Sequence, residues 1–120
     1  MALALSPIEA EQVRDLRARL NRVPAGAAGD KSVGPLSKGF FAVCGRVGLA
    51  PQTGGGGFSS VGELKTAIAE GNLVQLKQIV GRLQALQGGD FKVWRTLFGH
   101  GVLQDILTRR LVLAGREQAS

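Results

Sequence analysis

Residues 60–87, SVGELKTAIAEGNLVQLKQIVGRLQALQ, contain the clearest structural signals in this chain of 120 residues. Ser60 and Glu63 have the spacing of a capping box, in which the serine oxygen accepts an amide hydrogen bond and the glutamate reaches back to the serine amide. Asn72 is a favourable cap for a following helix. Between them, Gly71 is expected to end the first helix in the left-handed conformation that glycine adopts without steric cost. The stretch therefore predicts two helices joined at Gly71–Asn72.

Each helix of this predicted hairpin has its apolar side chains on one face. They recur at helical spacing as Val61, Leu64 and Ile68 in the first helix and as Leu73, Leu76, Val80 and Leu83 in the second. A helix with a single apolar stripe has to bury that stripe. We therefore expect the two helices to pack against each other and against the rest of the chain.

The rest of the chain also favours helices. The sequence contains no Tyr, and it is rich in residues that suit helices rather than strands. Further helices are predicted from Pro7 to about Val23, over 35–47 with Gly48 as its end, over a short segment at 91–98, and from Val102 to about Ala114. The predicted fold is an all-α bundle of five to six short helices, with a central helical hairpin at about 60–87.

Two long Gly-rich loops, at about 24–34 and 48–59, separate these helices. The length fits one helical domain over residues 1–120. Loops of this length are uncommon in a compact domain, so we expect them to be flexible or to contact a partner. A homo-oligomer is the expected state.

The chain is basic, with 15 Lys and Arg against 9 Asp and Glu and a net charge of +6. A basic surplus favours nucleic acid, anionic lipid or an acidic protein as partner, without choosing among them. The single cysteine excludes an internal disulfide framework. No apolar run approaches the length of roughly 18 residues that spans a bilayer, and the opening residues lack the pattern of a secretory signal. We expect a protein of the cytoplasm or of a particle.

Groups suited to catalysis are scarce. His100 and Cys44 are the single histidine and the single cysteine, and they lie far apart in the sequence. A zinc site needs three or four ligands, which this pair does not supply. The acidic residues near the N-terminus lie on a helix that also carries arginines, with no sign of two carboxylates of separated pKa. The sequence predicts no enzymatic activity, no cofactor and no metal.

Contact with nucleic acid or another anionic partner is predicted for a set of arginines near helix ends and beside Trp94. They are Arg14, Arg17, Arg22, Arg95, Arg109 and Arg110. The alternative is that these side chains form solvated faces, or satisfy terminal carbonyls and complement helix dipoles.

A second candidate surface is the aromatic stripe of the short helix, formed by Phe91, Trp94 and Phe98 with basic residues between them. Such a stripe can anchor a partner or stack bases. The alternative is that it belongs to the core.

The predicted function is that of a non-catalytic basic structural protein, in particular a coat or nucleocapsid-type subunit that self-associates and makes non-specific phosphate contacts with nucleic acid. The alternative is a helical protein–protein interaction module, such as an adaptor, chaperone or inhibitor, that uses the aromatic face. A continuous basic surface favours the first reading, whereas scattered, paired arginines around an apolar groove favour the second.

Overall fold

The computed structural model describes residues 5–22, 33–50, 60–89, 96–97 and 99–115, and all statements below concern these residues. They form five α-helices and no strand, which confirms the predicted all-α bundle. The helices are α1 (Pro7–Asn21), α2 (Val33–Arg46), α3 (Val61–Glu70), α4 (Leu73–Gly89) and α6 (Val102–Leu113). Most of the two predicted loops and of the short helix at 91–98 lies outside the described residues.

Helices α3 and α4 begin at the caps that the sequence predicts, and α1 begins at a cap of the same kind. At α1, the Ser6 amide donates to Glu9 Oε1 (3.0 Å) and the Glu9 amide donates to Ser6 Oγ (3.2 Å), which is a complete capping box. At α3, the Glu63 amide donates to Ser60 Oγ at 3.1 Å. These bonds satisfy amides that a helix start leaves without a partner inside the helix.

The α3–α4 connection and the end of α2 are also stabilised by hydrogen bonds between residues close in the sequence. Asn72 and Gln75 exchange two hydrogen bonds of 2.9 Å between amide and side-chain oxygen at the start of α4. Gly48 has φ 81°, a left-handed conformation, and the next amide, of Leu49, donates to the Cys44 carbonyl at 2.7 Å. This pattern ends a helix and buries the residue that follows the glycine, and Leu49 is fully buried.

Gly71 ends α3 for a different reason from the predicted one. Its backbone is extended, with φ −74° and ψ 149°, so the predicted left-handed conformation is wrong. A Cβ at this position would lie 2.8 Å from the main-chain oxygen of Ala67. The glycine is therefore required by the close approach of the turn to the last turn of α3, and not by the sign of φ.

Replacement of Gly71 by alanine is expected to lower the free energy of unfolding by about 1–3 kcal/mol, because the added methyl overlaps a backbone atom that a side-chain rotation cannot move away. The measurement is urea-induced unfolding followed by circular dichroism. Gly45→Ala is the control, since a Cβ there meets no atom within 4 Å. As an alanine inside an exposed helix, it should stabilise the protein by about 1 kcal/mol. A stabilising Gly71→Ala would contradict the steric explanation.

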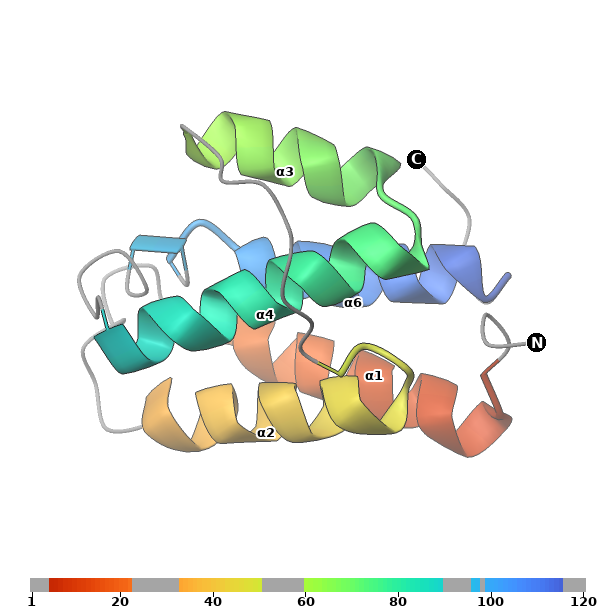
Figure 1. The fold of residues 1–120 in the computed structure, drawn as a ribbon. Coiled ribbons are helices and arrows are strands. Elements are labelled where there is room, and N and C mark those ends of the chain that lie inside the picture. The colour runs from red at the N-terminus through yellow and green to blue at the C-terminus, as the bar shows by residue number, and fades with distance from the viewer. Residues whose placement is uncertain (1–4, 23–32, 51–59, 90–95, 98, 116–120) are drawn as a thin grey trace.

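Helix α6, and not the hairpin, is the centre of the bundle (Figure 1). It packs most extensively against α1 and α3, while α3 and α4 contact each other much less. The reason is that α6 buries two adjacent stripes of side chains, at Val102, Leu103, Ile106, Leu107, Arg110 and Leu111. A helix buried over a wide arc can hold neighbours on several sides. In Figure 1, α3 lies on one side of α6, and α1 with α2 lies on the other.

The core includes residues of all five helices. Phe40 of α2 is fully buried, and its ring makes an edge-to-face contact with Phe41 at a centroid distance of 5.3 Å. Cys44 is also fully buried and belongs to the apolar core. In the part of the chain that the structure describes, none of the helices combines the length and the apolar character needed to cross a membrane.

Candidate functional site

Two of the predicted contact arginines, Arg109 and Arg110, are held by main-chain carbonyls of other helices. Arg110 is 1% exposed, and its Nε donates to the Val47 carbonyl just after α2 at 2.8 Å. Arg109 Nε donates to the Gly71 carbonyl at the end of α3 at 2.9 Å. These two arginines therefore satisfy carbonyls at helix ends, which is the alternative that the sequence left open. The carbonyls lie at the ends of α2 and α3 and not at the end of α6. Arg110 lies too deep in the core to contact a partner at the surface.

Burial lowers the pKa of Arg110, because the surrounding protein solvates the cation less well than water does. The negative charge of Glu9 opposes this shift. The guanidinium also lies at the C-terminal end of α2, where the helix dipole favours a positive charge. Two nearby sources of negative potential therefore compensate the burial of this charge.

The remaining predicted arginines fall into three groups. Arg17 NH1 donates to Thr108 Oγ1 at 3.0 Å, which joins α1 to α6. Arg14 on α1 and Arg22 just after its end are exposed, and their contact with an anionic partner stays a prediction. Arg95 lies outside the described residues, as does the predicted aromatic anchor of Phe91, Trp94 and Phe98.

Cys44 and His100 occupy different environments. Burial raises the pKa of the Cys44 thiol to about 12, so the thiol is protonated at neutral pH. His100 is exposed, and its main-chain oxygen accepts a hydrogen bond from Lys65 Nζ at 2.6 Å. A reactive cysteine needs an accessible thiolate beside a basic group, and Cys44 lacks this setting. Within the described segments, no group of three His, Cys, Asp or Glu side chains could hold a metal ion.

Positive charge gathers on two helices that sequence reasoning did not single out. Helices α2 and α4 carry Lys38, Arg46, Lys77 and Arg82 and contain no Asp or Glu. We call the surface formed by these four residues the α2–α4 surface. Lys38, Arg46 and Arg82 are exposed, and Lys77 is half-buried.

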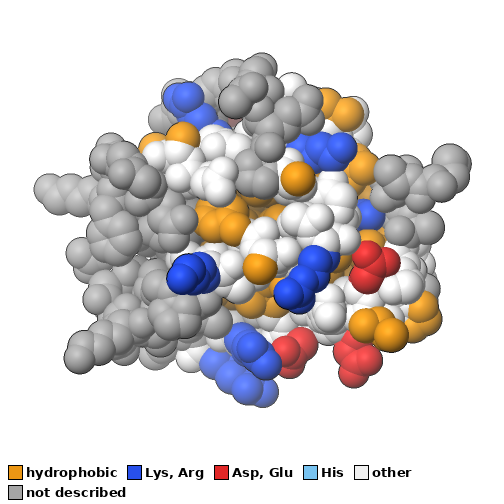
Figure 2. Space-filling view, turned by 60° about the horizontal axis from the view of Figure 1, so that its bottom comes forward, with side chains coloured by type: hydrophobic (Ala, Val, Ile, Leu, Met, Phe, Trp, Pro, Cys, Tyr) orange, Lys and Arg blue, Asp and Glu red, His pale blue; other side chains and the backbone are white. Residues whose placement is uncertain are grey.

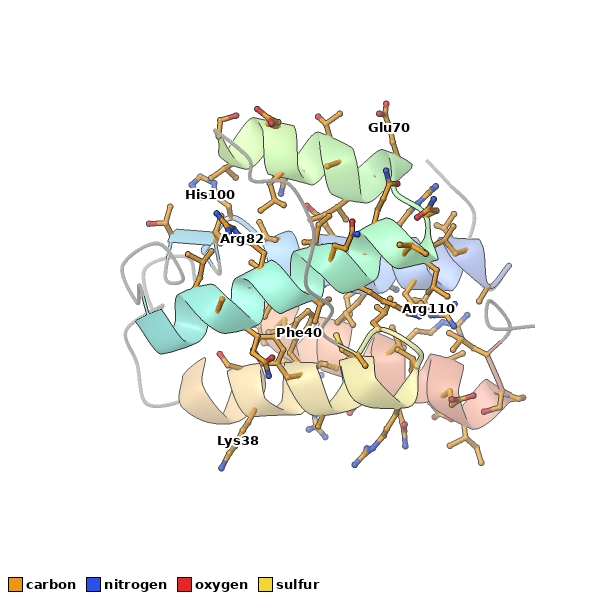
Figure 3. All side chains as sticks on the ribbon, in the orientation of Figure 1. Lys38, Phe40, Glu70, Arg82, His100 and Arg110 are labelled. Carbon is orange, nitrogen blue, oxygen red and sulfur yellow. The ribbon has the colours of Figure 1, made fainter. Side chains whose placement is uncertain are left out.

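The two helices lie next to each other on one side of the bundle. Figure 2 shows this side: Lys and Arg side chains are spread across it, and the visible Asp and Glu side chains gather toward one end. In Figure 3, Lys38 points away from α4 at the lower edge of α2, and Arg82 points away from α2 at the upper edge of α4, toward the same end of the molecule. The cations therefore span the width of the α2–α4 surface and do not line a narrow groove.

The described acidic residues lie on the other three helices, as Glu9, Glu11, Asp15, Glu63, Glu70 and Asp105. Asp15 pairs with Arg19 at 3.0 Å, and Asp105 pairs with Lys65 at 2.9 Å. Hydrogen bonds from Ser6 lower the pKa of Glu9 and keep this carboxylate ionised. Helices α1, α3 and α6 thus balance most of their own charge, while α2 and α4 carry an unbalanced surplus.

The sequence contains a signal for the α2–α4 surface, since neither of these two helices has an acidic residue. The cations of α2 and those of α4, however, lie far apart along the chain. Only the contact between α2 and α4 places these cations on neighbouring helices. No protein-family model, no curated protein and no solved structure matches this chain.

Proposed function

We propose that this chain is a non-catalytic structural protein that self-associates and contacts nucleic acid through the α2–α4 surface. The observation that carries the proposal is the segregation of charge, with four cations and no acid on two packed helices. A coat or nucleocapsid-type subunit needs a surface of this kind, which attracts phosphates without reading bases.

The spacing of the cations suits a phosphate backbone. Lys38 and Arg46 are separated by eight residues of α2, which corresponds to about 12 Å along a helix. One strand of a duplex presents a phosphate about every 3.4 Å along its axis. Both side chains, being long, can therefore reach different phosphates of one strand, while Arg82 lies on α4 at the opposite edge of the surface.

The protein-interaction alternative has less support in the described residues. The large hydrophobic side chains that are exposed there are Ile8 (70% exposed) on α1 and Val74 (51% exposed) on α4. Single exposed apolar residues on different helices do not make an apolar patch of the size that marks a protein-binding site.

The test is the binding of a fluorescent duplex oligonucleotide of arbitrary sequence, followed by anisotropy over a series of salt concentrations. The triple variant Lys38→Gln, Arg46→Gln, Arg82→Gln should bind about 100-fold more weakly at low salt, with a salt dependence that is shallower by about three ions, because each lost phosphate contact releases about one counterion fewer.

The matched control removes the same charge from α1, as Arg14→Gln, Arg19→Gln, Arg22→Gln. This control also tests the prediction that Arg14 and Arg22 contact an anionic partner. If the α2–α4 surface is the main contact, the control should reduce binding much less, since α1 carries acids beside its arginines. Negligible binding of the wild-type protein at low salt would remove nucleic acid from the proposal. An equal loss in both variants would show that net charge alone, and not the α2–α4 surface, determines the affinity.

A further inference from the structure

A line of exposed residues runs along the outer side of α1, opposite the side chains that the helix buries. Its members follow each other at alternating spacings of three and four residues, as Ile8, Glu11, Asp15, Ala18 and Arg22. Arg22 follows the helix but keeps a helical backbone, with φ −81° and ψ −13°. Such spacing keeps residues on one side of a helix and is typical of the seam along which two helices pack. We call this line the α1 seam.

The α1 seam carries two unpaired charges of opposite sign. In the part of the chain that the structure describes, the side chains of Glu11 and Arg22 form no ion pair and no hydrogen bond. Asp15, between them, is already paired with Arg19 at 3.0 Å. The acid lies toward the start of the helix and the cation toward its end, so the charge pattern of the seam is complementary to its own reverse.

Two α1 helices would therefore fit each other in an antiparallel arrangement. Glu11 and Arg22 are eleven residues apart, which corresponds to about 16.5 Å, or roughly three turns, along a helix. When a second α1 runs in the opposite direction about the same midpoint, its Arg22 lies opposite Glu11 and its Glu11 lies opposite Arg22. A parallel arrangement would instead bring like charges together, which is unfavourable.

We propose that two copies of this chain form a dimer through the α1 seam, with their α1 helices antiparallel. Glu11 of each copy pairs with Arg22 of the other, and the small side chain of Ala18 near the midpoint lets the helices approach closely. Ile8, which is 70% exposed, lies one turn before Glu11. The methylene stem of Arg22 from the second copy covers Ile8 while its guanidinium meets the carboxylate. The anionic partner predicted for Arg22 is thus a carboxylate of a second copy.

The dimer rests on the self-association in the proposed function and gives that self-association a geometry. Identical faces that meet in antiparallel fashion are related by a twofold axis, so the contact is closed at two copies. This axis lies across the two α1 helices, in the plane of their contact. Helix α2 packs beside α1, so the α2 helices of both copies lie on the same side of the dimer. Each dimer thereby carries two α2–α4 surfaces for nucleic acid.

The experiment is sedimentation velocity of the full chain, freed of nucleic acid, over a concentration series. Exposed ion pairs are individually weak and are screened by salt, so the dimer is expected at high protein concentration. At an ionic strength of about 20 mM the mean sedimentation coefficient should rise with concentration toward the value of a dimer, and at about 500 mM the rise should be much smaller because screening becomes strong.

Charge reversal tests the pairing itself. Glu11→Arg and Arg22→Glu each place like charges at both contacts of the seam, so each should abolish the rise at low salt. An equimolar mixture of the two variants should restore it, and so should a chain that carries both substitutions, since opposite charges then meet again. Glu70→Arg, the same charge change on α3, is the matched control and should leave the rise intact.

A wild-type sedimentation coefficient that is independent of concentration at low salt would overturn the proposal. So would a loss in Glu11→Arg that neither the mixture nor the double substitution restores, an equal loss in Glu70→Arg, or a rise that continues beyond the dimer. The Glu11→Arg variant keeps the whole α2–α4 surface and should bind the oligonucleotide at least as tightly as the wild type. Failure of the dimer and failure of nucleic-acid binding are therefore separate results.

Discussion

Replacement of Arg110 by alanine is expected to lower the free energy of unfolding by about 3–5 kcal/mol, measured by urea-induced unfolding at neutral pH. The side chain is 1% exposed, and its Nε donates to the Val47 carbonyl at 2.8 Å. Alanine leaves this carbonyl without that partner, which costs about 1–3 kcal/mol. It also removes the methylene stem from the core, which adds a packing loss.

Two further variants separate these contributions. Arg110→Met keeps most of the stem, so it should lose only about 1–2 kcal/mol, the share of the hydrogen bond. Arg109→Ala, whose half-buried side chain bonds the Gly71 carbonyl at 2.9 Å, should lose about 1 kcal/mol, a typical net value for a hydrogen bond that water can partly replace. A loss below about 1 kcal/mol in Arg110→Ala would contradict a role for this arginine in joining α6 to the end of α2.

Replacement of Phe40 by alanine is expected to lower the free energy of unfolding by about 3–5 kcal/mol, the usual range for an aromatic side chain removed from a core. Phe40 is fully buried and packs edge-to-face on Phe41. In Figure 3 it points from α2 into the bundle, on the side opposite to Lys38. It therefore holds in place the helix that carries half of the α2–α4 surface.

The Phe40 prediction has a functional part. Phe40→Leu retains most of the apolar volume and should lose less than about 1.5 kcal/mol. It should bind the oligonucleotide like the wild type, whereas Phe40→Ala should bind more weakly at temperatures where α2 is no longer held in place. The measurements are urea unfolding and fluorescence anisotropy on the same samples. Equal stability of the alanine and leucine variants would show that Phe40 does not anchor α2.

Local sequence predicts where most of the helices of this protein begin and end. The caps at Ser6, Ser60 and Asn72 involve partners only three residues away. The turn at Gly48 is closed by a hydrogen bond between the Leu49 amide and the Cys44 carbonyl, which are also close in the sequence. Interactions over so short a distance follow from residue type and spacing alone. At Gly71 the sequence predicts the position of the turn but not the reason for the glycine. The Ala67 carbonyl leaves no room for a Cβ, and the backbone is not left-handed.

The roles of the charged residues depend on tertiary packing. Arg17, Arg109 and Arg110 bond to residues that lie 91, 38 and 63 positions away in the sequence, and no local pattern distinguishes them from arginines that face water. The α2–α4 surface likewise exists only because two helices separated by α3 pack against each other. Helix boundaries are determined by neighbours in the chain, whereas the exposure of a charge is determined by whichever distant segment covers it.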